Sequence, residues 1–330
     1  MRPGDILPGI PGTSRRFGGG AVIEAGVLAH RAMRNGRRGR VAAVFDRSLY
    51  VVLDDCWICI GAKDLGSGPL HIHCTGLEPR RFSSGNAVVI VDGTILIDDL
   101  PFAGLDMASV WAPPPAPDWT LHSLRMGLTA VDEVWRLLPV EQGLAPSGGA
   151  RPPGRPSRLL TTAAPGLAAF KRLIEAGLRG QRCAARDHQG IVELIGLGPG
   201  LTPSGDDLIG GALVTLASLG RLATRDALWR ACRAHLDRSN AISAAHLRSA
   251  ALGYAAASLH EAVHAVIAGQ VDRIKPALTA LSKVGHSSGL DALAGALIVL
   301  RAVEFRLHRD SAPRDASLAV SSQQRSIAGL

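Results

Sequence analysis

The sequence is poor in aromatic residues and in lysine. Aromatic side chains make up 4% of its 330 residues, so a core built from this chain must rely on Ala, Leu, Val and Ile. Four lysines stand among 36 basic residues, and the arginine excess accompanies abundant Ala and Gly. This bias runs along the whole chain, so the net charge of +8 is a weak sign of an anionic partner. The densest basic stretch, 30–40, has no interleaved aromatics for base stacking, and we expect no nucleic-acid partner.

Long apolar runs are absent as well. A membrane-spanning helix needs about 18 or more consecutive apolar residues, and the sequence holds no such run. The opening stretch MRPGDILPGIPGTSRRF lacks the long apolar region of a secretory signal. We therefore expect no membrane partner and a cytoplasmic protein.

Cysteine is scarce and odd in number. Five cysteines in a chain of this length argue against a disulfide framework. Cys56 and Cys59 form a CxxC in a stretch that reads as a strand, where positions i and i+3 point to opposite faces. His71, His73 and Cys74 in HIHC could supply a second pair of zinc ligands, but the spacing matches no zinc ribbon. We expect structural, buried cysteines and no metal site here.

The order of patterns along the chain predicts an α+β protein. Residues 1–111 form a β-rich, barrel- or sandwich-like domain, in which VVIVDGTILI is a hairpin around Asp92 and Gly93. Residues 112–161 are a Pro/Gly-rich linker with one amphipathic helix over 120–139. Residues 162–308 show helical periodicity throughout, including one long helix over 241–268, and 309–330 form a disordered tail.

A short internal repeat stands out in the helical part. SGDDLIGGALVTL begins at Ser204 and SGLDALAGALIVL begins at Ser288, and each follows a Gly-containing loop. Ser followed three residues later by Asp predicts a capping box at the start of each helix, which would occupy Asp207 and Asp291. The glycines one turn further, 211 and 295, predict a close crossing of two similar helices whose N-termini face a common site.

The same helix starts suit an anionic ligand. A helix N-terminus carries unpaired N–H groups and partial positive charge, and the glycines at 196, 198 and 200 let the backbone approach closely. Asp206 has no counterpart in the second segment, where Leu290 stands, so capping leaves it unexplained. Two roles remain for it: binding Mg²⁺ that bridges to a phosphate, or accepting a proton from the substrate.

The candidate site residues follow from this reading. We expect Asp206, Asp207 and His286 to be catalytic, His286 being the nearest general acid or base in the second loop. Asn240, before AISAAHL, is expected to cap the following helix and to line the site. The substrate-binding set is Gly198, Gly200, Thr202, Ser204, Gly205, Asn240, Ser287, Ser288, Gly289 and Asp291.

GLGPGLTPSGDD, together with the later SGxDxxxG, resembles a bacterial domain-of-unknown-function family that includes one subunit of oxamate carbamoyltransferase. The resemblance carries the motif residues 198, 200, 202 and 204–207, and extends over most of the chain. It implies a transferase or transferase subunit that moves a carbamoyl group between phosphate and an oxamate-type amide, in allantoin and purine nitrogen breakdown. It further implies companion subunits and a small anionic substrate such as carbamoyl phosphate or oxamate.

Two alternatives stay open. HEAVH places His260 and His264 one turn apart on a helix with Glu261 as a base, which is the zinc hydrolase pattern, and Glu304 could be a third ligand. The chain could also be a non-catalytic subunit whose Gly/Asp loop senses a metabolite or serves as a scaffold.

Overall fold

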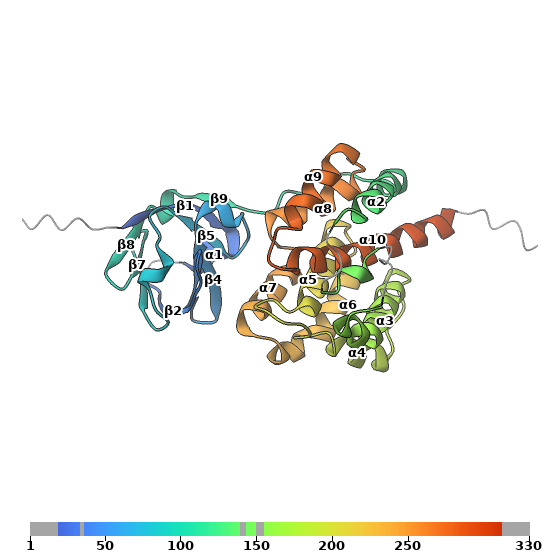
Figure 1. Ribbon diagram of the computed structural model, residues 1–330, viewed down its shortest axis with the longest axis horizontal. Helices are drawn as coiled ribbons and strands as arrows, with labels where there is room; N and C mark the ends of the chain where they lie inside the picture. The colour runs from blue at the N-terminus through green and yellow to red at the C-terminus, as the bar shows by residue number, and fades with distance from the viewer. Residues whose placement is uncertain (1–18, 34–35, 139–142, 150–154, 312–330) are drawn as a thin grey trace, which may run out of the picture. The chain divides into compact units, whose positions relative to one another are not determined.

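The computed structural model describes residues 19–33, 36–138, 143–149 and 155–311 (Figure 1). Contacts divide the chain into two compact units, one built mainly from residues up to 110 and the other mainly from 111 onward. Each unit has a hydrophobic core of its own, and none of the described residues belongs to both cores. Residues 309–311 of the predicted tail were wrongly assigned, because they belong to the last helix, which ends at Ser311. The rest of the predicted tail lies outside the described residues.

The first unit is a closed β-barrel, which confirms the predicted fold class. Eight strands close a ring in the order β5-β4-β3-β2-β6-β7-β8-β1, because β1 also pairs with β5, and β9 adds to β1. The pairs β1–β8 and β4–β5 are parallel, while β1–β5 and the hairpin pairs are antiparallel. The strands are β1 Gly20–Gly26, β2 Arg38–Val44, β3 Ser48–Leu53, β4 Cys56–Gly61, β5 His71–Cys74, β6 Ala87–Val91, β7 Thr94–Ile97, β8 Leu100–Ala103 and β9 Ser109–Trp111, with the short helix α1 at Val27–Ala32.

The hairpin between β6 and β7 forms where the sequence predicted it. Val91 pairs with Thr94, and the two residues between them, Asp92 and Gly93, have φ of 46° and 67°. Positive φ at both positions is what a two-residue hairpin turn needs, and Asp-Gly adopts it readily. Alternate residues such as Val88 and Ile90 point into the barrel core and are buried.

The second unit is helical. Its helices are α2 Leu121–Trp135, α3 Arg158–Leu178, α4 Ala185–Val192, α5 Ser204–Ser218, α6 Leu222–Cys232, α7 Ala241–Ala251, α8 Ala257–Ile267, α9 Val271–Leu281 and α10 Ser288–Ser311. Helix α2, expected within a linker, contributes Leu124, Val131 and Trp135 to the core of this unit. The long helix predicted over 241–268 is wrong, because Gly253 adopts φ of 86° and ends α7, and α8 begins four residues later.

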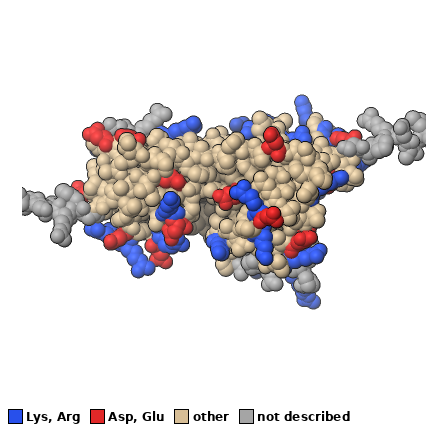
Figure 2. Space-filling model, turned by 90° about the horizontal axis from the view of Figure 1, so that it is seen from above, with Lys and Arg blue, Asp and Glu red and all other residues tan. Residues whose placement is uncertain are grey.

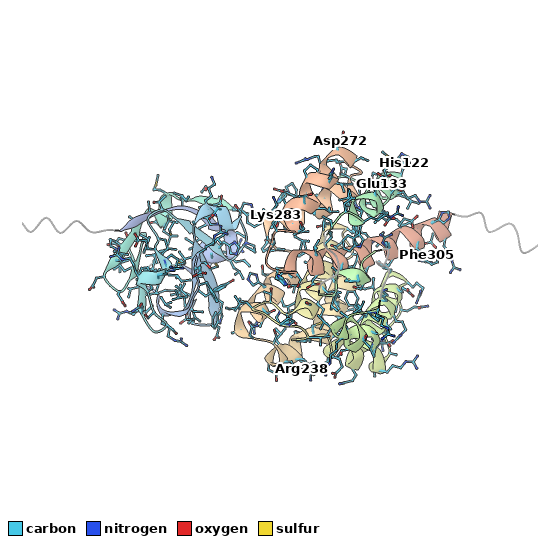
Figure 3. The ribbon with its side chains drawn as sticks, in the orientation of Figure 1. His122, Glu133, Arg238, Asp272, Lys283 and Phe305 are labelled. Carbon is cyan, nitrogen blue, oxygen red and sulfur yellow. The ribbon has the colours of Figure 1, made fainter. Side chains whose placement is uncertain are left out.

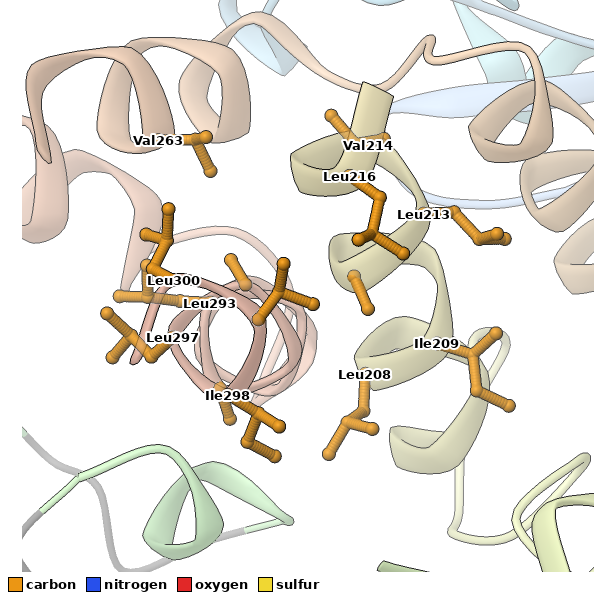
Figure 4. Close-up of a cluster of buried hydrophobic side chains, with 14 of the residues drawn as sticks. Leu208, Ile209, Leu213, Val214, Leu216, Val263, Leu293, Leu297, Ile298 and Leu300 are labelled. Atoms are coloured by element: carbon orange, nitrogen blue, oxygen red, sulfur yellow. The ribbon is translucent and has the colours of Figure 1, made fainter. Parts of the chain in front are cut away.

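Helices α5 and α10 pack against each other at the centre of this unit, with Leu208, Leu293 and Leu297 among the buried side chains around them (Figure 4). A methyl group on Gly211 would lie 1.9 Å from the Ala292 carbonyl oxygen, and one on Gly295 would lie 1.8 Å from the carbonyl oxygen of Leu208. The repeat therefore predicted the close crossing correctly, since each glycine admits the backbone of the other helix.

Candidate functional site

The two Gly-containing loops bring the starts of α5 and α10 together. The Thr202 hydroxyl lies 2.8 Å from the Ser288 hydroxyl, although the residues are 86 positions apart. Gly198 and Gly200 have φ of 118° and 99°, and Gly285 in the second loop has φ of 61°. These loops turn sharply just before each helix, and the left-handed backbone explains their glycines without a ligand.

Serine and aspartate of the repeat bond across the helix pair. Ser288 and Thr202 hydrogen-bond Asp207, while Ser204 hydrogen-bonds Asp291. Each acid thus binds the serine that starts the other helix, and the reciprocal glycine contacts have the same pattern. The two segments are related by an approximate two-fold exchange, and we call Thr202, Ser204, Asp207, Ser287, Ser288 and Asp291 the Ser/Asp cluster.

The predicted capping box of α5 is wrong. The N-cap is Pro203, which has no side-chain cap bond, and Ser204 is the first helical residue. The Pro203 carbonyl accepts from the amides of Asp206 and Asp207, while the Ser204 hydroxyl is turned to Asp291. Because local capping does not occupy Asp207, its carboxyl is free to join the cluster.

The helix-start amides are largely occupied by protein groups. Gly205 donates to the Leu197 carbonyl at 2.9 Å, and Gly289 donates to Val284 at 3.1 Å. A methyl group on Gly205 would lie 1.9 Å from the Leu194 carbonyl oxygen, so this glycine, like Gly289 against Leu281, is needed for packing. The expected cradle of backbone N–H groups for an anion therefore has few donors left at these positions.

Asp207 and Asp291 are the chemically unusual groups of the cluster. Oδ2 of each is buried and has no hydrogen-bond partner among the described residues. Burial raises the pKa of Asp207 well above its ordinary value, and repulsion from Asp291 adds to the rise. Burial raises the pKa of Asp291 too, although its Ser204 and Ser287 neighbours oppose the shift. Desolvated carboxyls with unfilled acceptor atoms are characteristic of acid–base and binding sites.

The Asp291 carboxyl has a further contact that the sequence did not reveal. Its Oδ1 accepts a hydrogen bond from the Leu144 amide at 2.6 Å, and Gly143 leaves no room for a side chain against the same carboxyl. Leu144 is 147 positions away, in the segment we expected to be a linker. Nothing in the local pattern around Leu144 could have indicated this role, because the donor is a backbone group.

Asp206 is not part of the Ser/Asp cluster and instead holds the Gly-rich loop in place. Its Oδ1 accepts from the Gly196 amide at 2.9 Å, and its Oδ2 accepts from the hydroxyls of Ser243, at 2.7 Å, and Ser239. Asn240 caps α7 through Ser243, as predicted, and also donates to the Leu201 carbonyl at 2.7 Å. The start of α7 thereby fixes both ends of the loop from 196 to 201.

The remaining predicted site residue, His286, is exposed in the turn before α10. An open cavity of about 640 Å³ borders the other loop at Gly196 and Leu197. Arg238, labelled in Figure 3, also lines it and faces Glu193 at 3.5 Å. In the view of Figure 2, basic and acidic side chains are interspersed, as expected for a solvated surface.

Both histidines of HEAVH, which lies in α8, contact other groups of the protein. His260 is 2% exposed, its Nε2 accepts from the Ala255 amide at 3.2 Å, and its pKa falls to about 4 because burial disfavours the charged form. His264 lies against Ser218 at 3.4 Å, and Glu304 is paired with Arg125 at 2.7 Å. Within the described ranges, no three His, Cys, Asp or Glu side chains gather to hold a metal.

Two of the barrel cysteines are buried thiols, as expected of structural residues. Burial raises the pKa of Cys59 to about 11 and that of Cys74 to about 12, so both remain thiols at neutral pH. Cys56, in contrast to our expectation, is exposed, because it begins β4 next to the turn at Asp54 and Asp55.

The helical unit is thus defined by two glycine-crossed helices whose starts share a Ser/Asp cluster. A family model described as oxamate carbamoyltransferase subunit AllH matches residues 194–300. This range includes both loops, both helix starts and the α7 cap, and over these residues the match confirms the predicted resemblance to the family. No solved structure matches the chain significantly. None of the described helices is long and apolar enough to cross a membrane.

Proposed function

We propose that this chain is a subunit of a carbamoyl-transfer enzyme of the oxamate carbamoyltransferase type, and that the Ser/Asp cluster is its substrate site. The observation that carries the proposal is the coincidence of two independent findings. The matched family range spans both repeat segments, and those segments meet at two buried carboxyls with unfilled oxygens. A cytoplasmic role in purine or allantoin nitrogen breakdown, alongside companion subunits, belongs to the same proposal.

The chemistry assigns distinct roles to the three aspartates. In carbamoyl transfer, the amide nitrogen of the acceptor attacks the carbonyl carbon of carbamoyl phosphate, phosphate leaves, and the nitrogen loses a proton. Asp207, with its raised pKa and unfilled Oδ2, is placed to accept that proton. Asp291, on α10, is the second carboxyl of the proposed site and holds the acceptor. Asp206, whose oxygens accept from Gly196, Ser239 and Ser243, is a positioning residue for the loop.

The test is carbamoyl transfer by the full chain assembled with its companion subunits. We expect Asp207→Asn to lower kcat by about 100-fold or more, since general acid–base groups typically contribute this much. Asp272→Asn, on the surface of α9, is the matched control and should leave the rate unchanged (Figure 3). Full turnover by the Asp207→Asn enzyme would refute the catalytic role, and loss of ligand binding alone would favour a metabolite-sensing subunit.

A further inference from the structure

The cavity beside the Gly-rich loop is separate from the Ser/Asp cluster and lies within the helical unit. Three segments line it: 162–166 in the first half of α3, 193–197 after α4, and Arg238 shortly before α7. Its volume of about 640 Å³ is within the range of roughly 300–1,000 Å³ that small-molecule sites occupy in proteins. The space therefore suits a small ligand.

The walls of this cavity are held together by Asp206, which is 2% exposed. Its carboxylate accepts from the Gly196 amide at 2.9 Å and from the Ser239 hydroxyl. Gly196 is part of one wall, and Ser239 directly follows Arg238 in the other. The Arg238 carbonyl also packs closely on Gly196, since a methyl group there would lie 2.2 Å from its oxygen. The two walls are fixed relative to each other, so a ligand meets a preorganised space.

The cavity carries one charge of each sign. Of the described residues that line it, Glu193 is the single acid and Arg238 the single base. They face each other at 3.5 Å, and their side chains are 59% and 44% exposed, so the pair contributes little free energy. The contact uses one guanidinium nitrogen, and the other N–H groups of the fork can bind a carboxylate. Pro165, Ile195 and Leu197 add apolar surface beside the two charges.

We propose that this cavity binds a small α-amino acid with an apolar side chain. The carboxylate of the amino acid accepts from Arg238, its ammonium group donates to Glu193, and its side chain lies on the apolar surface. A simple acid meets the like charge of Glu193, and a simple amine meets that of Arg238. A zwitterion avoids both repulsions, because its two charges and those of the protein alternate in sign.

Three molecules that share one side chain test this pairing of charges. L-Leucine carries both charged groups, isocaproate lacks the ammonium group, and isoamylamine lacks the carboxylate. We expect isothermal titration calorimetry on the full chain at neutral pH to show saturable binding of L-leucine. Each analogue should bind at least about 10-fold more weakly, because it loses the hydrogen bonds to one charged side chain.

Two variants assign the charges to their residues. Glu193→Gln and Arg238→Gln each remove one charge from an exposed side chain, so the fold should persist, which circular dichroism checks. Each should weaken L-leucine binding about 10-fold. Glu193→Gln should also reduce the preference for L-leucine over isocaproate, and Arg238→Gln the preference over isoamylamine. Glu133→Gln, on the exposed face of α2, is the matched control and should bind as wild type (Figure 3).

The binding data alone decide the proposal. Absence of saturable L-leucine binding, equal affinity for the three molecules, or unchanged affinity in either folded variant would overturn it. None of the described residues that line the cavity belongs to the Ser/Asp cluster, and carbamoyl transfer is not measured. The result is therefore independent of the proposed function.

Discussion

At the scale of single residues, we expect the buried carboxyl of Asp207 in the Ser/Asp cluster to lower the stability of the folded protein. The ordinary pKa of an aspartate is 3.8, and burial raises that of Asp207 well above it. Between these values the native state keeps a proton that the unfolded chain has released, so stability falls as pH rises through this interval. Asp207→Asn removes the titration. We expect its free energy of unfolding, relative to wild type, to increase as pH rises above 3.8 through the raised pKa of Asp207, measured in urea melts.

Asp187 provides the matched control because its shift has the opposite sign. Arg172 donates to its carboxylate at 2.7 Å and 2.9 Å and lowers its pKa below 3.8. The stabilisation from this pair is present above pH 3.8 and is lost as pH falls through the lowered pKa. Asp187→Asn should therefore lose stability relative to wild type as pH rises through that low range. The same pH slope in both variants would contradict the linkage argument.

At the scale of elements, the crossing of α5 and α10 is set by two adjacent glycines that have different surroundings. A methyl group on Gly211 would meet the Ala292 carbonyl oxygen at 1.9 Å, whereas the nearest atom to one on Gly210 is the Ala250 Cβ at 3.8 Å. Gly211→Ala must push the helices apart and should cost about 3 kcal/mol. Gly210→Ala gains helix propensity without a clash and should stabilise by about 0.5–1 kcal/mol.

Thermal and urea unfolding of the two variants give the comparison directly. The substitutions are identical and neighbouring, so they differ only in what the new methyl group meets. If both variants are stabilised, or both are destabilised to the same extent, the close helix contact is not what Gly211 provides.

The sequence predicted the elements that depend on local chemistry. Asp92-Gly93 determines its hairpin, and Asn240 caps α7. The glycines of the repeat predict a crossing because the absence of a side chain lets a second helix approach the backbone. The interpretation of Ser204 as a cap was wrong for a reason that lies outside the local sequence. Its hydroxyl can bond its own helix or Asp291, and only the position of α10 decides between them.

The same limit explains what the sequence could not show of the site. Asp206 looked unexplained because its three donors come from Gly196, Ser239 and Ser243, two of them more than thirty positions away. The Leu144 amide reaches Asp291 from a Pro/Gly-rich stretch with no pattern of its own. Long-range hydrogen bonds to backbone groups leave no signature in residue type. The sequence could therefore predict where the cluster lies, but not which hydrogen bonds connect its residues.

At the scale of the whole molecule, the two separate cores should unfold as separate units. The barrel core and the helical core share no residue, and each is centred on fully buried side chains such as Val51 in β3 and Leu297 in α10. A substitution destabilises the cooperative unit that contains it. Gly211→Ala should therefore lower amide protection across α5 and α10 while leaving β2, β3 and β6 protected in hydrogen-exchange mass spectrometry. Val51→Ala, which opens a cavity worth about 2 kcal/mol in the barrel, should do the reverse. Equal loss of protection in both units, from either variant, would mean that the chain folds as one cooperative structure and that the loops of the Ser/Asp cluster share the stability of the barrel.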